Sequence, residues 1–306
     1  MRRLALAFTL LAGPASAEEN WHPSKYGAGD ELGAANLLSP EGVVAAANLV
    51  TKGNVYQLGI ETNTNTPAFP PRGFKLYIVQ PDQQGAQTLN GMTYNDDIVE
   101  GWFGVGSQID GLGHLGIDHI YYNGLHAKDF AKPTGLTKLG IENVPPIVTR
   151  GVLIDVAGHR GVERLEKGSP VNSAEIKDIA EAHGVSIGEG DVVLIHTGWI
   201  TLLEEDPAEF ASGAPGLGVD GAEYLAAAGV VAIGGDSTAL EAVPHEPNTG
   251  AYPVHQILLA KNGVYILENM DTRALAADQV YEFLFVLGHA RVTGAVQMII
   301  NPVAIR

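Results

Sequence analysis

The second half of the chain alternates short apolar runs with helix-like segments, and this alternation restricts the folds open to it. The apolar runs span residues 152–156, 191–196, 230–233 and 264–267, and the helical segments between them span 173–183, 220–228 and 254–261. A glycine follows each helical segment, as is typical of helix C-termini. Strands that alternate with helices predict an α/β fold. No linker or repeat divides the chain, so we expect a single domain over residues 18–306.

The first half carries weaker signals of the same kind. Ser39 followed by Pro40 predicts a helix start, and the helix should continue to residue 50. Runs rich in β-branched and aromatic residues at 55–60 and 75–79 predict two strands. The proline-rich stretch 67–72 between them is predicted to be a loop.

Polar side chains follow three of the apolar runs, at the point where each predicted strand ends. They are His196, Asp236 and Glu268. Ligands of α/β proteins bind beyond the carboxyl ends of strands, so these residues are candidates for a site. His196 is equally well explained as a hydrogen-bonded core histidine, and Asp236 as a helix cap. A buried carboxylate at position 268 needs a partner, either an arginine such as Arg273 or a metal ion.

A glycine-rich segment at 104–114 brings a carboxylate and an imidazole close together in sequence. Asp110 and His114 lie four residues apart among four glycines. Glycine lets the backbone approach a ligand closely and adopt positive φ. Asp and His are suited to holding a divalent metal or moving a proton, although the same residue types also occur in ordinary turns. The segment is therefore a candidate site that needs support from elsewhere in the chain.

The composition indicates a globular protein and argues against two classes of partner. Hydrophobic residues make up 45% of the 306 residues, and there is no cysteine, so a packed core must stabilise the fold without disulfides. The net charge of −17 argues against nucleic acid and anionic membranes as partners, because both require clustered positive charge. No run after the N-terminus reaches the length of a membrane span.

The N-terminus has the order of regions found in secretory signal peptides. Two arginines at positions 2 and 3 precede a short apolar run, and Ala15-Ser16-Ala17 fits a cleavage site. We therefore expect residues 1–17 to be a signal peptide and the mature protein, from residue 18, to be exported, to the periplasm if the host is a Gram-negative bacterium.

The order of these segments resembles the cyclase family of metal-dependent hydrolases, which includes bacterial kynurenine formamidase and isatin hydrolase. That family carries the motif His-x-Gly-Thr-His-x-Asp-x-Pro-x-His, and residues 104–114 keep Gly106, Asp110 and His114 of it. Segments 193–198, 231–236 and 255–268 also match, so the resemblance covers roughly residues 100 to 300. It implies a mixed-sheet, single-domain fold of the swivelling β/β/α type, and a homodimer or homotetramer.

Two metal-binding histidines of the family motif are replaced here, by Gly104 and Gln108, and Leu112 stands for the proline. The resemblance implies Asp110, His255 and Glu268 as ligands of a divalent metal, zinc or manganese, with the carbonyl oxygen of Gln108 as a further candidate. His114 would be a general base or an additional ligand. Because two nitrogen donors are missing, we expect one ion and not two. His119 is a candidate replacement ligand, and equally a packed or a substrate-facing histidine.

This resemblance predicts an exported hydrolase that acts on a small cyclic amide or an aryl formamide. The metal would activate water and polarise the carbonyl, with His114 as general base. Trp102, Phe103 and Tyr121, with the adjacent Tyr122, are predicted to form an apolar wall for the substrate, although core packing is the alternative. Two other functions stay open: a lactonase or esterase that uses the same site, and a non-catalytic periplasmic protein that binds a small molecule.

Overall fold

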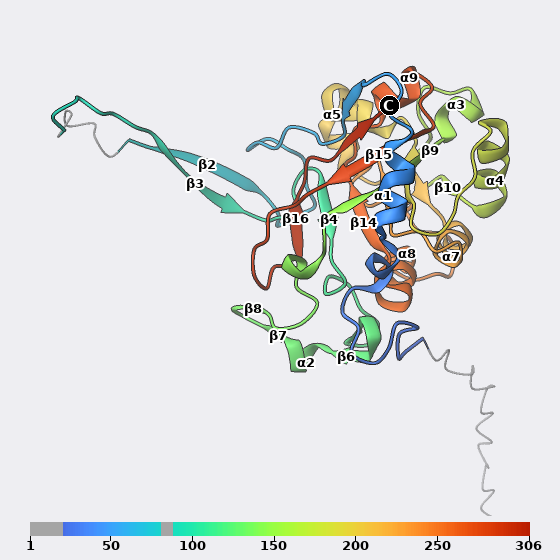
Figure 1. Ribbon diagram of the computed structural model, residues 1–306, viewed down its shortest axis with the longest axis horizontal. Helices are drawn as coiled ribbons and strands as arrows, with labels where there is room; N and C mark the ends of the chain where they lie inside the picture. The colour runs from blue at the N-terminus through green and yellow to red at the C-terminus, as the bar shows by residue number, and fades with distance from the viewer. Residues whose placement is uncertain (1–20, 81–87) are drawn as a thin grey trace, which may run out of the picture.

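The computed structural model describes residues 21–80 and 88–306 (Figure 1). The predicted signal peptide, residues 1–17, lies outside the described residues. Within them, no helix is long and apolar enough to cross a membrane.

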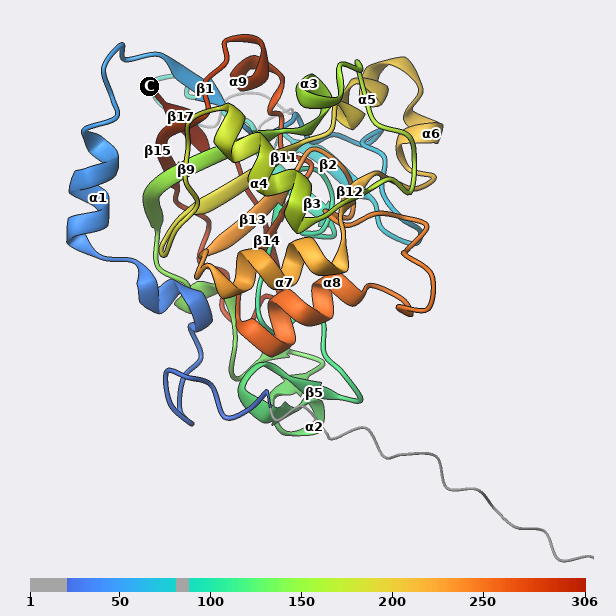
Figure 2. The same ribbon diagram turned by 90° about the vertical axis from the view of Figure 1, so that its right-hand side faces the viewer.

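A mixed sheet of nine strands forms the centre of the described chain (Figures 1 and 2). Its four middle strands run parallel and their outer neighbours run antiparallel to them. The strands, in spatial order, are β1 (Val55–Gln57), β17 (Val303–Ile305), β15 (Glu282–Leu287), β9 (Ile147–Asp155), β11 (Val192–His196), β13 (Ala232–Gly235), β14 (Tyr265–Glu268), β4 (Gln108–Asp110) and β16 (Gln297–Ile299). The predicted α/β fold is confirmed.

The four parallel strands are those that the apolar runs predicted. Strands β11, β13 and β14 are buried along their whole length, which is why they read as continuous apolar runs and not as alternating ones. Strand β9 is longer than predicted: it begins at Ile147, because its first half pairs with β15 at the C-terminal end of the chain.

Helices pack side by side over one face of this sheet (Figure 2). They are α4 (Ser173–Ala182), α7 (Val219–Ala227), the short α8 (Pro253–His255) and the π-helix η5 (Gln256–Asn262) that continues α8. The predicted helix 254–261 thus exists, but most of it is π-helical. It ends as predicted at Gly263, whose φ of 65° suits glycine. Helix α1 (Pro40–Ala47) is capped as predicted by Ser39, whose side chain accepts a hydrogen bond from Gly42 N, but it ends at Ala47 and not at residue 50.

The remaining described elements are short. They are the helices α2 (Ala127–Phe130), α3 (Val156–Arg160), α5 (Leu202–Glu205), α6 (Pro207–Phe210) and α9 (Arg273–Ala277), the 3-10 turns η1 (Gly33–Leu37), η2 (Tyr122–Gly124), η3 (Ile141–Asn143) and η4 (Trp199–Thr201), and the strand pairs β5 (Ile120–Tyr121) with β6 (Leu125–His126), β7 (Ala131–Lys132) with β8 (Gly135–Leu136) and β10 (Pro170–Val171) with β12 (Gly216–Leu217).

Two strands leave the body of the molecule as a hairpin arm. Strands β2 (Phe74–Val79) and β3 (Asp96–Gly101) pair only with each other, and Figure 1 shows them projecting from the body. The predicted strand 75–79 is therefore real, but it is not part of the central sheet. The predicted strand 55–60 ends at Gln57, and the proline-rich loop before the arm forms as predicted.

Candidate metal centre

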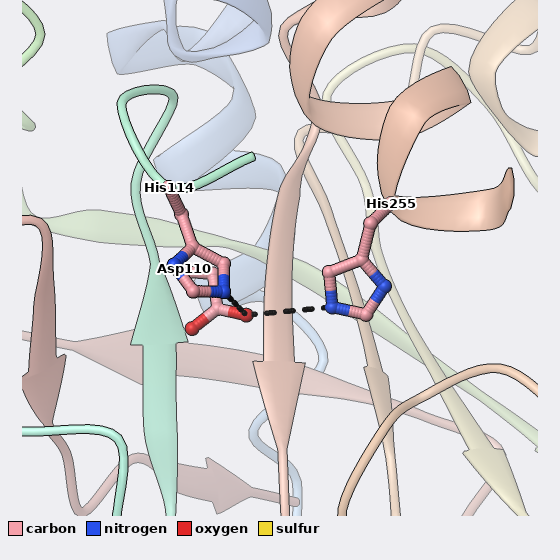
Figure 3. A group of neighbouring side chains, drawn as sticks. All are labelled: Asp110, His114 and His255. Atoms are coloured by element: carbon pink, nitrogen blue, oxygen red, sulfur yellow. Dashed lines mark ion pairs between the residues drawn. The ribbon is translucent and has the colours of Figure 1, made fainter. Parts of the chain in front are cut away.

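Three side chains from separate segments converge on one point, with Asp110 at the centre (Figure 3). Asp110 ends strand β4, His114 lies in the turn that follows, and His255 ends α8. The Oδ2 atom of Asp110 lies 3.7 Å from His255 Nε2 and 3.9 Å from His114 Nε2. One ligand atom from each residue lies within 4.8 Å of the others, a separation that a single metal ion can bridge.

The glycines around this site permit close backbone approach. Gly111 donates a hydrogen bond from its N–H to Val296 O, and a Cβ on Gly111 would lie only 2.7 Å from that oxygen. Gly106 has a φ of 76°, which glycine adopts without strain. The turn then returns at His114, whose N–H donates to Gly111 O. The expectation that glycine shapes this segment is confirmed at these two positions.

Glu268 joins the group through the register of β4 and β14. These strands are antiparallel and pair Gln108 with Glu268, so the two side chains lie opposite one another. Glu268 Oε1 lies 3.4 Å from His255 Nε2, and Gln108 Nε2 donates to Glu268 Oε2 at 2.7 Å. Arg273, the alternative partner suggested for Glu268, pairs instead with Asp271 and Glu204, so that expectation is wrong.

Two amide side chains contact the Oδ1 atom of Asp110. Gln297 Nε2 donates to Asp110 Oδ1 at 2.6 Å, and Gln108 Nε2 lies 3.2 Å from the same oxygen. Two buried atoms at the centre have no hydrogen-bond partner within the described chain: Asp110 Oδ2 and Gln108 Oε1. An unpaired, fully buried carboxylate oxygen that faces two imidazoles requires an explanation, and a bound cation supplies one.

A further carboxylate orients His255 from behind. Glu241 is buried, and its Oε1 lies 2.5 Å from His255 Nδ1 and accepts a hydrogen bond from His255 N at 3.0 Å. With Nδ1 bonded to Glu241, His255 presents Nε2 to Asp110 and Glu268. This carboxylate–histidine arrangement is common behind metal-bound histidines.

Burial and mutual charge shift the ionisation of the whole group. Burial, and secondly the negative charge of Asp110, raise the pKa of Glu268 to about 7. Burial also raises the pKa of Asp110, but His114 and His255 outweigh it and bring that pKa to about 2. Burial lowers the pKa of His255, yet its bonds to Asp110, Glu241 and Glu268 hold the pKa well above the usual value. Burial lowers the pKa of His114. The site is rich in buried carboxylate, which a cation would compensate.

The residues present fit a divalent metal ion. Asp110 Oδ2, Glu268 Oε1 and the Nε2 atoms of His255 and His114 are donors that zinc and manganese both accept, and the oxygen donors favour manganese more than a histidine-rich set would. His119 lies apart from this group: it is exposed, and its ring stacks on that of His126 with the centroids 6.0 Å apart, so it is neither a replacement ligand nor a core histidine.

A cavity of about 370 Å³ opens onto this centre. Its lining includes the candidate metal residues His114, His255 and Glu268, and the wall residues Phe69, Pro70, Pro71, Arg72, Trp102, Leu115, Thr238 and Tyr252. Of the three predicted substrate residues, Trp102 lines the cavity, whereas Phe103 and Tyr121 are not among the lining residues in the described chain. Tyr121 packs edge-on against Phe130, and Tyr122 is buried in the core.

The other two strand-end residues organise a loop. Asp236 accepts hydrogen bonds from Thr197 N and Gly198 N, and His196 Nδ1 lies 2.7 Å from Thr272 Oγ1. Both side chains are buried, and His196 Nδ1 lies 3.3 Å from Asp236 Oδ2. The structural interpretation of His196 therefore holds, and Asp236 holds the loop after β11 instead of capping a helix.

Four residues around the centre were not identified from the sequence. The sequence does contain a signal for Glu241, because it is a lone carboxylate among apolar residues. Arg72 lies in the predicted loop, and Thr238 lies two residues after Asp236. Gln297 had no signal at all, because only the pairing of β16 with β4 places it opposite Asp110.

The fold and this centre define a single-domain α/β protein with a buried candidate metal site beside a cavity. A family model described as "Putative cyclase" matches residues 44–242. A solved structure described as a novel cyclase is 30% identical, covers 94% of this chain and 99% of its own, and superposes with a TM-score of 0.84. The chain belongs to the cyclase family.

More distant structures share the fold. Isatin hydrolase A from Ralstonia solanacearum is 17% identical, with a TM-score of 0.64 over 88% of this chain and 98% of that one. Isatin hydrolase A from Labrenzia aggregata, bound to benzyl benzoate, is 16% identical, with a TM-score of 0.62 over 85% and 94%. No curated protein gives a significant match. The predicted resemblance is confirmed, and so is the predicted fold.

Proposed function

We propose that this protein is a metal-dependent hydrolase that cleaves a C–N bond in a small cyclic amide or an aryl formamide. The observation that carries the proposal is the convergence of Asp110, His114, His255 and Glu268 at the inner end of a cavity. Membership of the cyclase family and a fold shared with isatin hydrolases support the same class of reaction.

We assign the metal to Asp110, His255 and Glu268, with one ion per chain. A divalent ion held there supplies a Lewis acid for the substrate carbonyl and acidifies water. The assignment of one ion rests on Asp110: its Oδ1 already accepts from Gln108 and Gln297, which leaves only Oδ2 free. Gln108 Oε1 stays a candidate further ligand, since it has no partner in the described chain.

His114 is assigned as the general base. It lines the cavity, and its side chain is the most exposed of the four at 20%. Burial keeps the pKa of its imidazole below the ordinary value, so the ring is neutral and able to accept a proton at neutral pH. It accepts the proton from the attacking water and returns it to the leaving nitrogen.

The substrate test uses three matched compounds: a formanilide, a five-membered aryl lactam and the corresponding lactone. Metal-loaded protein is expected to hydrolyse one of the amides, and Asp110→Ala is expected to abolish turnover. Faster turnover of the lactone than of both amides would favour the lactonase alternative. Metal-loaded protein that binds the compounds and turns none over would favour the binding-protein alternative.

Export of the protein is a separate proposal, supported by the N-terminal sequence alone. N-terminal sequencing of the protein from a periplasmic fraction is expected to begin at residue 18. A chain that starts at Met1 and stays in the cytoplasm would contradict export.

We also propose a homodimer or homotetramer. The arm supports this, because an isolated two-stranded hairpin is at best marginally stable in water. Leu76 and Ile78 on β2 and Ile98 on β3 are all more than half exposed on it. Light scattering after size exclusion is expected to give at least twice the chain mass. A monomer at micromolar concentration would contradict the proposal.

A further inference from the structure

An arginine lines the cavity beside the candidate metal centre, and no carboxylate of the described residues pairs with it. Arg72 lies at the root of the arm and lines the cavity, and its Nη1 donates to the backbone oxygen of Gly104 at 3.2 Å. Within residues 21–80 and 88–306, no ion pair joins it to an acidic side chain. Its charge is near enough to act on His114 and Glu268. A guanidinium that makes one backbone hydrogen bond and no ion pair within the described chain still has donors left to bind a planar anion.

The glycine at position 104 makes room for this guanidinium. A Cβ on Gly104 would lie 2.8 Å from Arg72 Nη1 and 3.0 Å from Gln297 Oε1. A side chain at residue 104 would therefore force the end of the Arg72 side chain to shift from this position.

A second polar group in the same cavity lacks a partner. Thr238 is 7% exposed and lines the cavity, and its Oγ1 has no hydrogen-bond partner in the described chain. A buried hydroxyl without a partner costs free energy unless a ligand or water satisfies it. The aromatic rings of Phe69 and Trp102 complete the wall. The cavity thus offers the guanidinium of Arg72, the hydroxyl of Thr238 and an aromatic surface.

We propose that Arg72 and Thr238 bind a carboxylate of the substrate, which makes this hydrolase selective for aromatic amides that carry an anionic group. The claim that the bound anion is part of the substrate rests on the proposed function, whereas the anion site itself does not. Arg72 binds the carboxylate in bidentate fashion, Thr238 donates its hydroxyl proton, and Trp102 contacts the ring.

The first experiment measures binding without turnover. Benzoate and benzamide are titrated into the metal-loaded protein, with tryptophan fluorescence as the signal, and compared with Arg72→Met and with Arg160→Met. Arg160 pairs with Glu175 on the surface, so its loss changes net charge equally. We expect benzoate to bind about 10–100-fold more weakly to Arg72→Met and unchanged to Arg160→Met, while benzamide is unaffected by either. Equal benzoate affinity in all three proteins would overturn the proposal.

The second experiment compares formanilide with formamidobenzoates whose carboxylate stands at ring position 2, 3 or 4. The unmodified protein is expected to prefer one carboxylated compound in kcat/KM, and Arg72→Met to lose that preference through KM. Gly104→Ala, which displaces the guanidinium without removing it, is also expected to reduce the preference for the carboxylated compound. An equal fall in kcat for neutral and anionic compounds would place Arg72 at the reacting carbonyl and overturn the carboxylate site.

These outcomes separate the two proposals. Benzoate binding that depends on Arg72, with no hydrolysis of any amide, would keep the anion site and reject the hydrolase. Hydrolysis with no preference for anionic compounds would keep the hydrolase and reject the anion site.

Discussion

Replacing Glu241 by glutamine tests whether the centre is built to hold a metal. Glu241 is 1% exposed, and its two oxygens accept from the ring and backbone of His255 and from Val254 N. Glutamine keeps the volume but has only one acceptor oxygen, so its NH₂ group must face a backbone donor. The bond to the His255 ring also loses its charge assistance, which roughly halves its strength.

The expected loss follows from these contacts. Removing the partner behind a metal-bound histidine weakens metal affinity by about 10–100-fold. That range equals about 1.4–2.7 kcal/mol, the scale of one charge-assisted hydrogen bond replaced by a neutral one. Zinc dissociation constants would be measured by competition with a chromogenic chelator, and thermal unfolding would verify the fold.

The matched control is Glu246→Gln. Glu246 accepts a hydrogen bond from Val219 N at the start of α7 and none from His255, so its loss should leave metal affinity unchanged. A Glu241→Gln protein that is folded and binds zinc as tightly as the unmodified protein would refute the assignment of His255 as a ligand oriented by Glu241.

Three further predictions concern other residues. His114→Gln is expected to retain the metal and lose turnover by about 10²–10⁴-fold; loss of the metal would make His114 a ligand. Histidine at both 104 and 108 is expected to raise the metal content, and more so with Arg72→Ala, because a Cβ at 104 would meet Arg72. Burial lowers the pKa of His196, but Asp236 outweighs this and raises it above the ordinary value. That stabilisation is present in acid and disappears as the pH rises through the raised pKa, so His196→Gln should cost more stability in urea unfolding at about pH 5 than at about pH 9. An equal cost at both values would contradict it.

The sequence predicted the parallel centre of the sheet because each of its strands is an uninterrupted apolar run. Residues 191–196 became β11 almost unchanged, and the stop at Gly263 was correct for a helix of unexpected type. The arm was not predicted. Strand 75–79 reads like a core strand, and nothing local reveals that its only partner is β3.

The residues of the centre that belong to the family motif were predicted, and those that distant strand pairing brings to the centre were missed. Asp110, His114, His255 and Glu268 were all named from the resemblance, and they lie together. Gln297 is 187 residues from Asp110, and only the register of β16 with β4 brings them into contact. Arg72 lies in a loop that local sequence describes only as irregular. Such contacts depend on the folded topology, which local patterns do not encode.

The number of metal ions per chain tests the central claim most directly. Protein purified without chelator, then equilibrated with zinc or manganese and freed of loosely bound metal, would be analysed by inductively coupled plasma mass spectrometry. The arrangement of Asp110, His255 and Glu268 predicts about one tightly held ion per chain, and almost none in Glu268→Ala. Two tightly held ions per chain would contradict the one-ion centre, and full hydrolase activity without bound metal would contradict the mechanism itself.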